Sequence, residues 1–304
     1  MNKRNKWIKV FQSWQLYVLL LPAITWILVF AYYPMYGLLI AFKDFKIRKG
    51  ILMSPWADPI WKHFSQFFTT SIAITAIENT IVISLLSLLI AFPIPIIFAL
   101  LLNQVRHKRM RKAMQTISYA PYFLSSVVII SLINLLFSTE GIVNGIITGV
   151  GGDVIHFTSM AKWFRPLYVG STVWQTMGFN AVIYIAALVG ISPDYYEAAT
   201  LDGASTFQKI KYIELPLIAP TIILMLILTI GNIMNVGYEK AYLMQNGTNT
   251  TVSELISTYV YKVGLQSAQY SFATAVGLFN SVVNFIILLL ANKLSKRVSD
   301  ISIF

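Results

Sequence analysis

Six long apolar segments constrain this chain more than any other feature of its sequence. A helix needs about 20 mostly apolar residues to cross the hydrocarbon core of a bilayer. Because only helices and closed barrels satisfy their backbone hydrogen bonds inside lipid, such segments predict an all-α polytopic protein with six transmembrane helices. The apolar segment 141–150 is too short to span, so we expect a short external or re-entrant helix there. The expected spans are about 16–42, 73–102, 117–138, 167–192, 214–236 and 272–292.

The composition supports a bilayer as the main solvent. Only 12% of the residues are charged and the mean hydropathy is +0.68, whereas soluble domains carry roughly 25% charged residues. The net charge of +11 is best explained by membrane topology, because basic residues hold loops on the cytoplasmic side, and we expect no nucleic-acid partner. The absence of cysteine excludes disulfides, thiolate metal sites and a cysteine nucleophile.

The distribution of lysine and arginine predicts the orientation. Segments on the same side as the N-terminus carry 14 of these residues in 62 positions, and the opposite segments carry 9 in 93. Both termini are therefore expected in the cytoplasm, with the chain crossing the plasma membrane repeatedly and contacting membrane lipid. The run 106–112 is interpreted as a topology anchor against anionic lipid. One loop argues the other way, since it holds Lys43, Lys46, Arg48, Lys49 and Lys62.

The first fifteen residues form a basic segment with an apolar face. Trp7, Phe11 and Trp14 recur at helical spacing among several lysines. This pattern is typical of a helix that lies in the plane of the lipid headgroups. A disordered basic tail is the alternative interpretation.

The loop at 193–216 has a specific local pattern. Pro193 suits the first turn of a helix, and Gly203 stops that helix. The sequence 205–208, Ser-Thr-Phe-Gln, is a capping box that predicts a second short helix, and Pro216 marks the start of the fifth span. The loop is therefore expected to be a helix, a glycine turn and a second helix at the cytoplasmic surface. An ordinary surface helix between two spans would show the same composition.

The spacing within this loop carries a family resemblance. EAA, three residues, Gly, nine residues, Ile, one residue and Leu-Pro resembles the signature loop of binding-protein-dependent ABC importer permeases. Further stretches at 118–144, 173–188, 235–246 and 258–281 are similar to the carbohydrate-uptake branch, within it to permeases for polysaccharide and aldouronate-type oligosaccharides. The resemblance covers roughly residues 10–300. The matched signature positions are Glu197, Ala198, Ala199, Gly203, Ile213, Leu215 and Pro216.

The resemblance implies a type I ABC importer permease fold, a place in the plasma membrane of a bacterium and a set of partners. The loop would be a coupling helix that docks on a cytoplasmic ATPase, with Asp202 beside the matched residues. The expected assembly contains a second homologous permease and two ATPase subunits. An extracellular substrate-binding lipoprotein would deliver an oligosaccharide. The chain would divide into a cytoplasmic amphipathic segment at 1–15, the first transmembrane helix and external loop at 16–72, a core permease domain of five helices at 73–292, and a cytoplasmic tail at 293–304.

The chain shows no signature of its own chemistry. No G-x-x-x-x-G-K-[ST] sequence is present, so ATP and Mg²⁺ are expected on the partner subunits and no cofactor on this chain. His63, His107 and His156 lie far apart in the sequence, and none has metal-ligand spacing. We expect no catalytic residue and no metal.

Polar and aromatic side chains within the spans are candidates for a sugar path, because polar groups at membrane depth usually face the bundle interior or a water-filled cavity. Each of them has helix–helix hydrogen bonding as an alternative role. A secondary transporter or channel for a polar solute is the alternative function, but it would favour buried charges and internal repeats. A membrane enzyme would need clustered His, Asp or Glu. The path candidates are Tyr119, Tyr122, Asn134, Trp174, Gln175, Asn180, Tyr184, Asn232, Asn235, Asn280 and Asn284.

Overall fold

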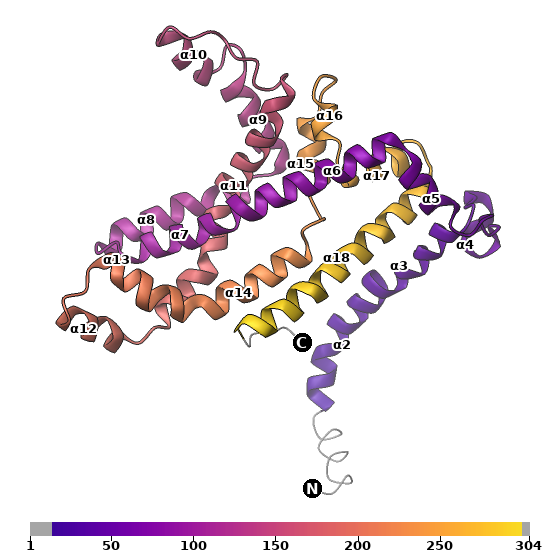
Figure 1. Cartoon of the computed structure of the whole chain (residues 1–304). Coiled ribbons are helices and arrows are strands. Elements are labelled where there is room, and N and C mark those ends of the chain that lie inside the picture. Colours follow the sequence, from indigo (N-terminus) through magenta and orange to yellow (C-terminus); the bar gives the residue numbers. More distant parts are fainter. Residues whose placement is uncertain (1–13, 300–304) are drawn as a thin grey trace, which may run out of the picture. The chain divides into compact units, whose positions relative to one another are not determined.

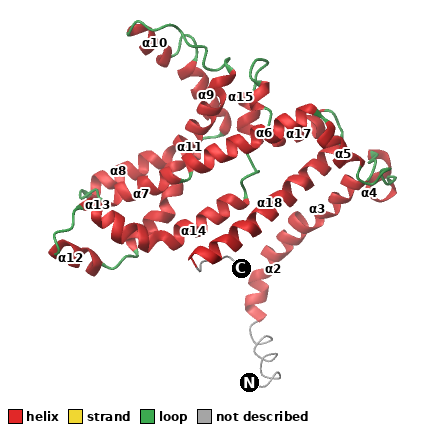
Figure 2. Cartoon of the chain, in the orientation of Figure 1, coloured by secondary structure: helices red, strands yellow, loops and turns green. Residues whose placement is uncertain are grey.

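A computed structural model describes residues 14–299 of the chain. Within this range helices are joined by loops and turns, and the only extended pairing is an isolated bridge between Lys43 and Trp56 (Figure 2). The prediction of six membrane-spanning helices is confirmed. The spans are Trp14–Phe42, Ser71–Asn103, Ser126–Gly149, Ala161–Val189, Thr206–Gly231 and Tyr270–Arg297.

The chain divides into two compact units. Unit 1 comprises Met1–Phe67 and Val263–Leu278, and unit 2 comprises Phe68–Lys262 and Phe279–Phe304. The last long helix, α18 (Tyr270–Ser299), contributes its beginning to unit 1 and the rest to unit 2 (Figure 1).

Unit 1 contains the first span and the basic external loop. Lys43 is buried in this loop, and its Nζ donates to the carbonyl oxygens of Ile51 at 2.9 Å and Leu52 at 2.8 Å. Lys62 forms an ion pair with Asp44, which lowers the pKa of that carboxyl group. Two of the five basic residues in this loop therefore have partners within it. The helices of unit 1 are α2 (Trp14–Ile27), η1 (Leu28–Tyr32), α3 (Tyr33–Met35), η2 (Tyr36–Phe42), η3 (Ile47–Lys49), α4 (Gly50–Met53), most of α5 (Lys62–Thr69), most of η7 (Lys262–Gln266) and the start of α18.

Unit 2 is a helical bundle in which α11 (Ala161–Val189) packs along α7 (Pro93–Asn103) (Figure 1). Ile96, Ala181 and Ile218 belong to one buried apolar cluster that joins α7, α11 and α14 (Leu215–Gly231). Close van der Waals packing of these side chains holds the three helices together, because lipid tails supply no hydrophobic driving force between spans. The second span also includes α6 (Ser71–Leu86) and the π-helical turn η4 (Ser87–Ala91).

The third span begins later than predicted. A helix was expected from residue 117, but α8 (Lys108–Tyr119) is a separate helix that ends before the 3₁₀ turn η5 (Ala120–Phe123). The break has a local cause, because Pro121 lies in this turn and the Ser125 side chain caps α9 (Ser126–Phe137) by accepting from Val128 N. The short helix expected at 141–150 is α10 (Ile142–Gly149).

The fifth span begins earlier than predicted. The second short helix of the 193–216 loop is not separate, since α13 (Thr206–Lys209) continues through the π turn η6 (Ile210–Glu214) directly into α14. Pro216 lies in this continuous helix directly after the π turn, and the π turn accommodates the residue without an N–H group.

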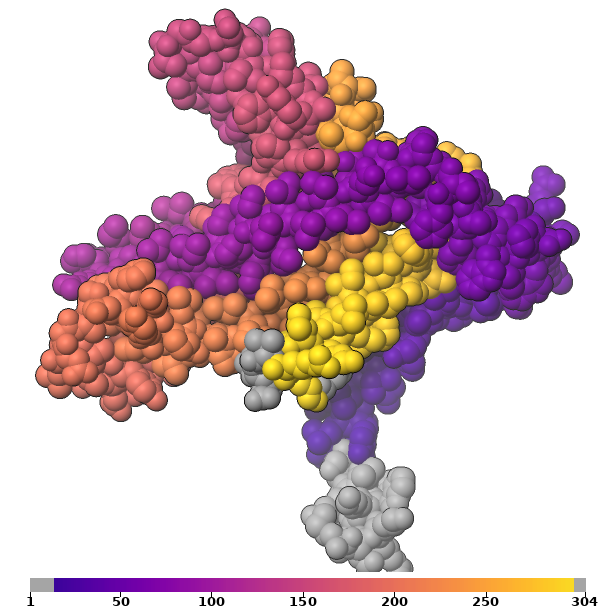
Figure 3. All heavy atoms as spheres, in the orientation of Figure 1, coloured from indigo at the N-terminus to yellow at the C-terminus, as the bar shows by residue number. Residues whose placement is uncertain are grey.

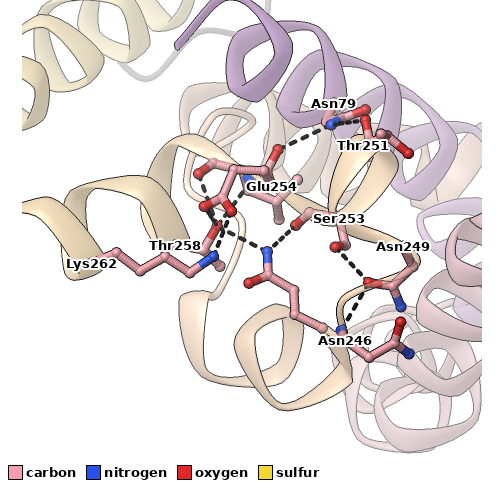
Figure 4. Close-up of polar contacts among 10 residues, drawn as sticks. Asn79, Asn246, Asn249, Thr251, Ser253, Glu254, Thr258 and Lys262 are labelled. Atoms are coloured by element: carbon pink, nitrogen blue, oxygen red, sulfur yellow. Dashed lines mark hydrogen bonds and ion pairs between the residues drawn. The ribbon is translucent and has the colours of Figure 1, made fainter. Parts of the chain in front are cut away.

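The segment 237–271 is not a simple loop. It folds into α15 (Tyr238–Met244), α16 (Thr250–Ser253), α17 (Ile256–Tyr261) and η7 (Lys262–Gln266). A polar network attaches it to α6, because Asn79 Nδ2 donates to the carbonyl oxygens of Thr251 and Glu254 (Figure 4). Lys262 forms an ion pair with Glu254 in the same network. These helices are short and polar, so the apolar periodicity gave no signal for them.

Candidate coupling loop and translocation cavity

The loop at 193–216 has the helix and glycine turn that the sequence predicts. Ser192 Oγ accepts from Asp194 N at 3.3 Å and starts α12 (Pro193–Leu201). Gly203 follows with φ of +71°, a conformation that strongly favours glycine. The predicted capping box forms, since Ser205 N donates to Gln208 Oε1 at 2.7 Å and Gln208 N donates to Ser205 Oγ at 3.3 Å.

The outer face of this loop is free to bind a partner. Glu197 is exposed and makes no hydrogen bond or ion pair with any residue in 14–299. Leu201 is 90% exposed and Phe207 is 71% exposed. An unpaired carboxylate beside exposed large apolar side chains is typical of an interaction surface. Figure 3 shows the segment 193–209 at the surface of unit 2, at the lower left of the view.

The inner face of the loop is fixed by Glu214, which sequence reasoning passed over. Its side chain is fully buried, and it accepts from Asn103 Nδ2 at 2.7 Å and from Gln104 Nε2 at 2.9 Å. It also accepts from Tyr196 Oη at 3.2 Å. Burial, and then the negative charge of Glu214, raise the pKa of Tyr196 to about 12. One carboxylate therefore joins the 193–216 loop to the end of α7 and to the fifth span.

The remaining signature residues lie around this core. Ala198, Asp202 and Pro216 are exposed, whereas Ala199, Ile213 and Leu215 are half-buried. The signature thus has one side toward solvent and one side toward the bundle.

A cavity of about 530 Å³ lies inside unit 2. Its volume is within the range of small-molecule sites. Its walls come from α6, η4, α7, α11, α14 and the segment 232–237. One stripe of α11, with a side chain at every fourth position, lines the cavity along about 24 Å of helix. The stripe consists of Tyr168, Thr172, Thr176, Asn180 and Tyr184.

Four of the predicted path residues line this cavity, namely Asn180, Tyr184, Asn232 and Asn235. Sequence reasoning missed the hydroxyl groups of the lining, because single Ser and Thr residues are common in spans. The recurrence of polar residues at spacing four in α11 was the signal that could have found them. The missed polar residues are Ser84, Ser87, Tyr168, Thr172, Thr176 and Thr229.

The other path candidates lie outside the cavity lining. Asn280 and Asn284 each donate to Asn235 Oδ1 at 3.2 Å, and Asn284 Oδ1 accepts from Met234 N. These hydrogen bonds attach α18 to the segment that carries Met234 and Asn235. Asn280 and Asn284 therefore have the helix–helix hydrogen-bonding role that was the alternative for each candidate. Gln175 donates to Leu124 O, so it ties α11 to the turn before α9.

Apart from Tyr184, the aromatic candidates are also placed away from the lining. The ring of Tyr122 stacks on Phe179 at 3.8 Å between centroids. Trp174 is exposed, Tyr119 is half-buried, and burial raises the pKa of Tyr119. Asn134 lines a different, smaller cavity of about 270 Å³.

A buried lysine adjoins the main cavity. Lys240 of α15 is 8% exposed, and its Nζ donates to Thr172 Oγ1 at 2.9 Å. The same atom lies 5.2 Å from the centroid of the Tyr168 ring. Burial lowers the pKa of Lys240 to about 7. The sequence placed this residue in an external loop and gave no reason to expect its burial.

These features define a membrane protein with six spans, an interior cavity lined by polar and apolar side chains, and an exposed loop. In residues 14–299 no group of three or more His, Asp or Glu is arranged to hold a metal ion. Comparison with known proteins gives the class more closely. Residues 91–300 match the family described as binding-protein-dependent transport system inner membrane component.

Two curated relatives from Bacillus subtilis (strain 168) match nearly the whole chain. The polygalacturonan/rhamnogalacturonan transport system permease protein YteP is 41% identical over 100% of this chain and 94% of its own length. Protein LplB is 40% identical over 99% of this chain and 92% of its own length.

Solved structures agree with these relatives. A crystal structure of a bacterial ABC transporter involved in the import of the acidic polysaccharide alginate matches with a TM-score of 0.89 and 42% identity, covering 97% of this chain and 99% of that chain. A second structure of a bacterial alginate ABC transporter, in complex with an alginate pentasaccharide-bound periplasmic protein, also matches with a TM-score of 0.89 and 41% identity, covering 98% of this chain and 99% of that chain. The chain belongs to the family of binding-protein-dependent transport system inner membrane components, the permeases of ABC importers. The resemblance stated from the signature loop is thereby confirmed.

Proposed function

We propose that this chain is the permease subunit of a bacterial ABC importer for oligosaccharides derived from complex glycans. The single observation that carries the proposal is the cavity of unit 2, which is lined by three spans in a chain of this family and places hydroxyl and amide side chains among apolar ones. Its hydroxyl, amide and aromatic side chains are the groups that hydrogen-bond and stack with sugars. The relatives named for polygalacturonan and alginate transport support a glycan as cargo.

The proposed assembly contains parts that this chain lacks. A second homologous permease would complete the membrane pathway, and two cytoplasmic ATPase subunits would bind ATP and Mg²⁺. An extracellular lipoprotein would deliver the sugar, by analogy with the periplasmic protein in the alginate transporter structure. This chain then acts as a transport subunit without an ATPase site of its own.

Energy would enter through the loop at 193–216. Glu197 and the exposed apolar side chains beside it would dock on the ATPase, because they have no partner within the described chain. Movement of α12 would reach the spans through Tyr196 and Glu214, since Glu214 also holds Asn103 at the end of the second span. The sugar must bind the outward and inward states with different affinity for ATP to drive import.

The orientation follows from this proposal. The ATPase is cytoplasmic, so the 193–216 loop and both termini lie on the cytoplasmic side. The basic external loop, which argued against this orientation, is partly explained by its structure. Lys43 is buried against backbone carbonyls and Lys62 is paired with Asp44, so neither acts as a free cation facing anionic lipid.

The coupling proposal is tested in the assembled transporter, reconstituted with its partner permease, ATPases and binding protein. Glu197→Lys should lower sugar uptake at least tenfold and abolish the ATPase stimulation by loaded binding protein. The control Glu140→Lys reverses an exposed charge outside the loop and should leave both unchanged. Normal uptake by the Glu197→Lys transporter would overturn the docking proposal.

The multi-subunit proposal has a simpler test. The purified chain alone should neither bind nor hydrolyse ATP, whereas the assembled transporter should hydrolyse it. ATP hydrolysis by the pure chain would contradict the proposal that separate subunits bind and hydrolyse ATP. Uptake that persists without ATP and stops with an ionophore would favour the secondary-transporter alternative.

A further inference from the structure

Lys240 is a buried cation without an anionic partner. Its ammonium group donates one hydrogen bond, to the neutral hydroxyl of Thr172 at 2.9 Å, and lies over the Tyr168 ring. The ion pairs in residues 14–299 involve Lys62, His63 and Lys262 instead. The adjacent Glu239 is exposed and accepts from Ser126 Oγ at 2.8 Å, so its carboxylate already has a separate partner.

This arrangement costs stability. Removing an ammonium group from water is unfavourable unless an opposite charge and good hydrogen bonds replace the water. The Thr172 hydroxyl and the face of the Tyr168 ring replace only part of the hydration that the ammonium group loses. A methionine would fill similar space at lower cost. Residues that break a packing rule in this way commonly serve binding or transport.

The position of Lys240 connects it to the main cavity. Its two contacts, Thr172 and Tyr168, both line that cavity. Thr172 Oγ1 donates its own hydrogen to Tyr168 O at 2.8 Å, so its lone pairs are what Lys240 binds. Gly237, three residues before Lys240, also lines the cavity, and an added Cβ there would meet no atom within 4 Å. The ammonium group therefore lies directly behind the part of the cavity wall that Tyr168 and Thr172 form.

The chemistry of the cavity suits an anion. An ammonium group has three N–H donors, and Thr172 takes one of them. No Asp or Glu belongs to the lining, so no negative charge would repel an acidic ligand. The hydroxyl and amide groups along α11 remain to form hydrogen bonds with the uncharged hydroxyl groups of a sugar.

We propose that the cavity is a binding site for acidic oligosaccharides, in which the Lys240 ammonium group pairs with the carboxylate of a uronate residue while Thr172 orients it. This inference rests on the proposed function and narrows its substrate class. Burial lowers the pKa of Lys240 to about 7, and a bound carboxylate raises it again, so binding of the anion favours proton uptake by Lys240.

The test compares two sugars that differ only in charge, trigalacturonate and its fully methyl-esterified form. In the reconstituted transporter, Lys240→Met should lower trigalacturonate uptake at least tenfold and change uptake of the ester by less than about twofold. Lys240→Arg keeps the charge and should retain most of the trigalacturonate uptake. The control Lys162→Met removes an exposed cation of α11 outside the cavity and should change neither.

A direct readout avoids dependence on the binding protein. A small amine-acylating reagent and mass spectrometry would follow the modification of Lys240 in the assembled permease complex without binding protein. Trigalacturonate should slow this modification at least fivefold, and the methyl ester should not. Equal protection by both sugars, or by neither, would overturn the inference.

The outcomes distinguish failure of the importer function from failure of the acidic-sugar inference. If the unmodified transporter moves neither sugar nor any other oligosaccharide, the proposed function and this inference both fall. If sugars are transported but Lys240→Met lowers uptake of both forms equally, or of neither, only the inference falls and the importer function stands.

Discussion

Tyr196 Oη donates a hydrogen bond to Glu214 Oε1 at 3.2 Å across eighteen residues of chain. This contact joins α12, which carries the exposed Glu197, to the first turns of the fifth span. Glu214 receives two further side chains from the end of the second span, so all of its partners are neutral donors. A carboxylate held only by hydrogen bonds is sensitive to the loss of any one of them.

Replacing Tyr196 by phenylalanine should weaken this junction. The change removes one hydrogen bond to a buried charge, which is worth about 1.5–3 kcal/mol. We expect a lower unfolding temperature in detergent and fewer sugars imported per ATP hydrolysed. Tyr195→Phe is the matched control, because Tyr195 is exposed on the same helix and no hydrogen bond of its hydroxyl is seen. Equal behaviour of the two variants would show that the Tyr196–Glu214 bond does not transmit motion.

Gly203 is required by backbone conformation rather than by space within the chain. Its φ is +71°, and a Cβ added there meets no atom within 4 Å. Gly203→Val should therefore cost roughly 1–2 kcal/mol through strain and displace α12, whereas Gly203→Asn should cost less because Asn tolerates this conformation. Circular dichroism melting and coupled uptake measure the two effects. If uptake falls equally in both variants, space for the ATPase, and not strain, explains the glycine.

Gly178 marks a close approach between two helices of unit 2. An added Cβ would overlap the carbonyl oxygen of Ser118 at the end of α8. Gly178→Ala should destabilise the protein by about 1–3 kcal/mol, because backbone must move. Gly170→Ala on the same helix meets no atom within 4 Å and should stabilise it by roughly 0.5–1 kcal/mol. Thermal unfolding should shift in opposite directions for the two variants, and a shared direction would contradict the packing argument.

Lys240 predicts a pH dependence of stability with a definite sign. Its pKa is about 7 in the folded protein and 10.5 ordinarily, so between these values the unfolded state binds more protons. The contribution of Lys240 therefore becomes less unfavourable as the pH rises from 7 to 10.5, and is constant and most unfavourable below 7. Lys240→Met should raise the unfolding temperature most near pH 7 and least near pH 10. If the rise in unfolding temperature of Lys240→Met does not vary with pH, Lys240 is uncharged or solvated in the folded protein.

The surroundings of Lys240 give this test a single titrating group near pH 7. Tyr168 is the titratable side chain of α11 that faces it. Tyr261 of α17 instead packs against Tyr238 and Tyr242, and α9 has no charged residue. Lys162→Met should show no comparable pH dependence, because Lys162 is exposed.

Local patterns in the sequence determined much of the fold. Apolar runs located six spans because a bilayer requires them to be long and uninterrupted. The capping residues Ser205 and Gln208 and the turn at Gly203 were readable because each acts within a few residues of chain. The limits of the third and fifth spans were not, since a 3₁₀ turn at Pro121 and a π turn ending at Glu214 depend on packing as well as on sequence.

Pairings between distant residues were beyond the sequence alone. Glu214 and Asn103 are separated by 111 residues, and Lys240 and Thr172 by 68. A single glutamate or lysine near an apolar run has the same appearance whether it faces water, lipid or a buried hydroxyl. The sequence by itself determined the number and approximate places of the spans, the signature loop and the family, because those depend on local spacing. Only the tertiary structure decided which polar side chains share a cavity and which charges are buried, because burial and pairing arise when separate helices pack together.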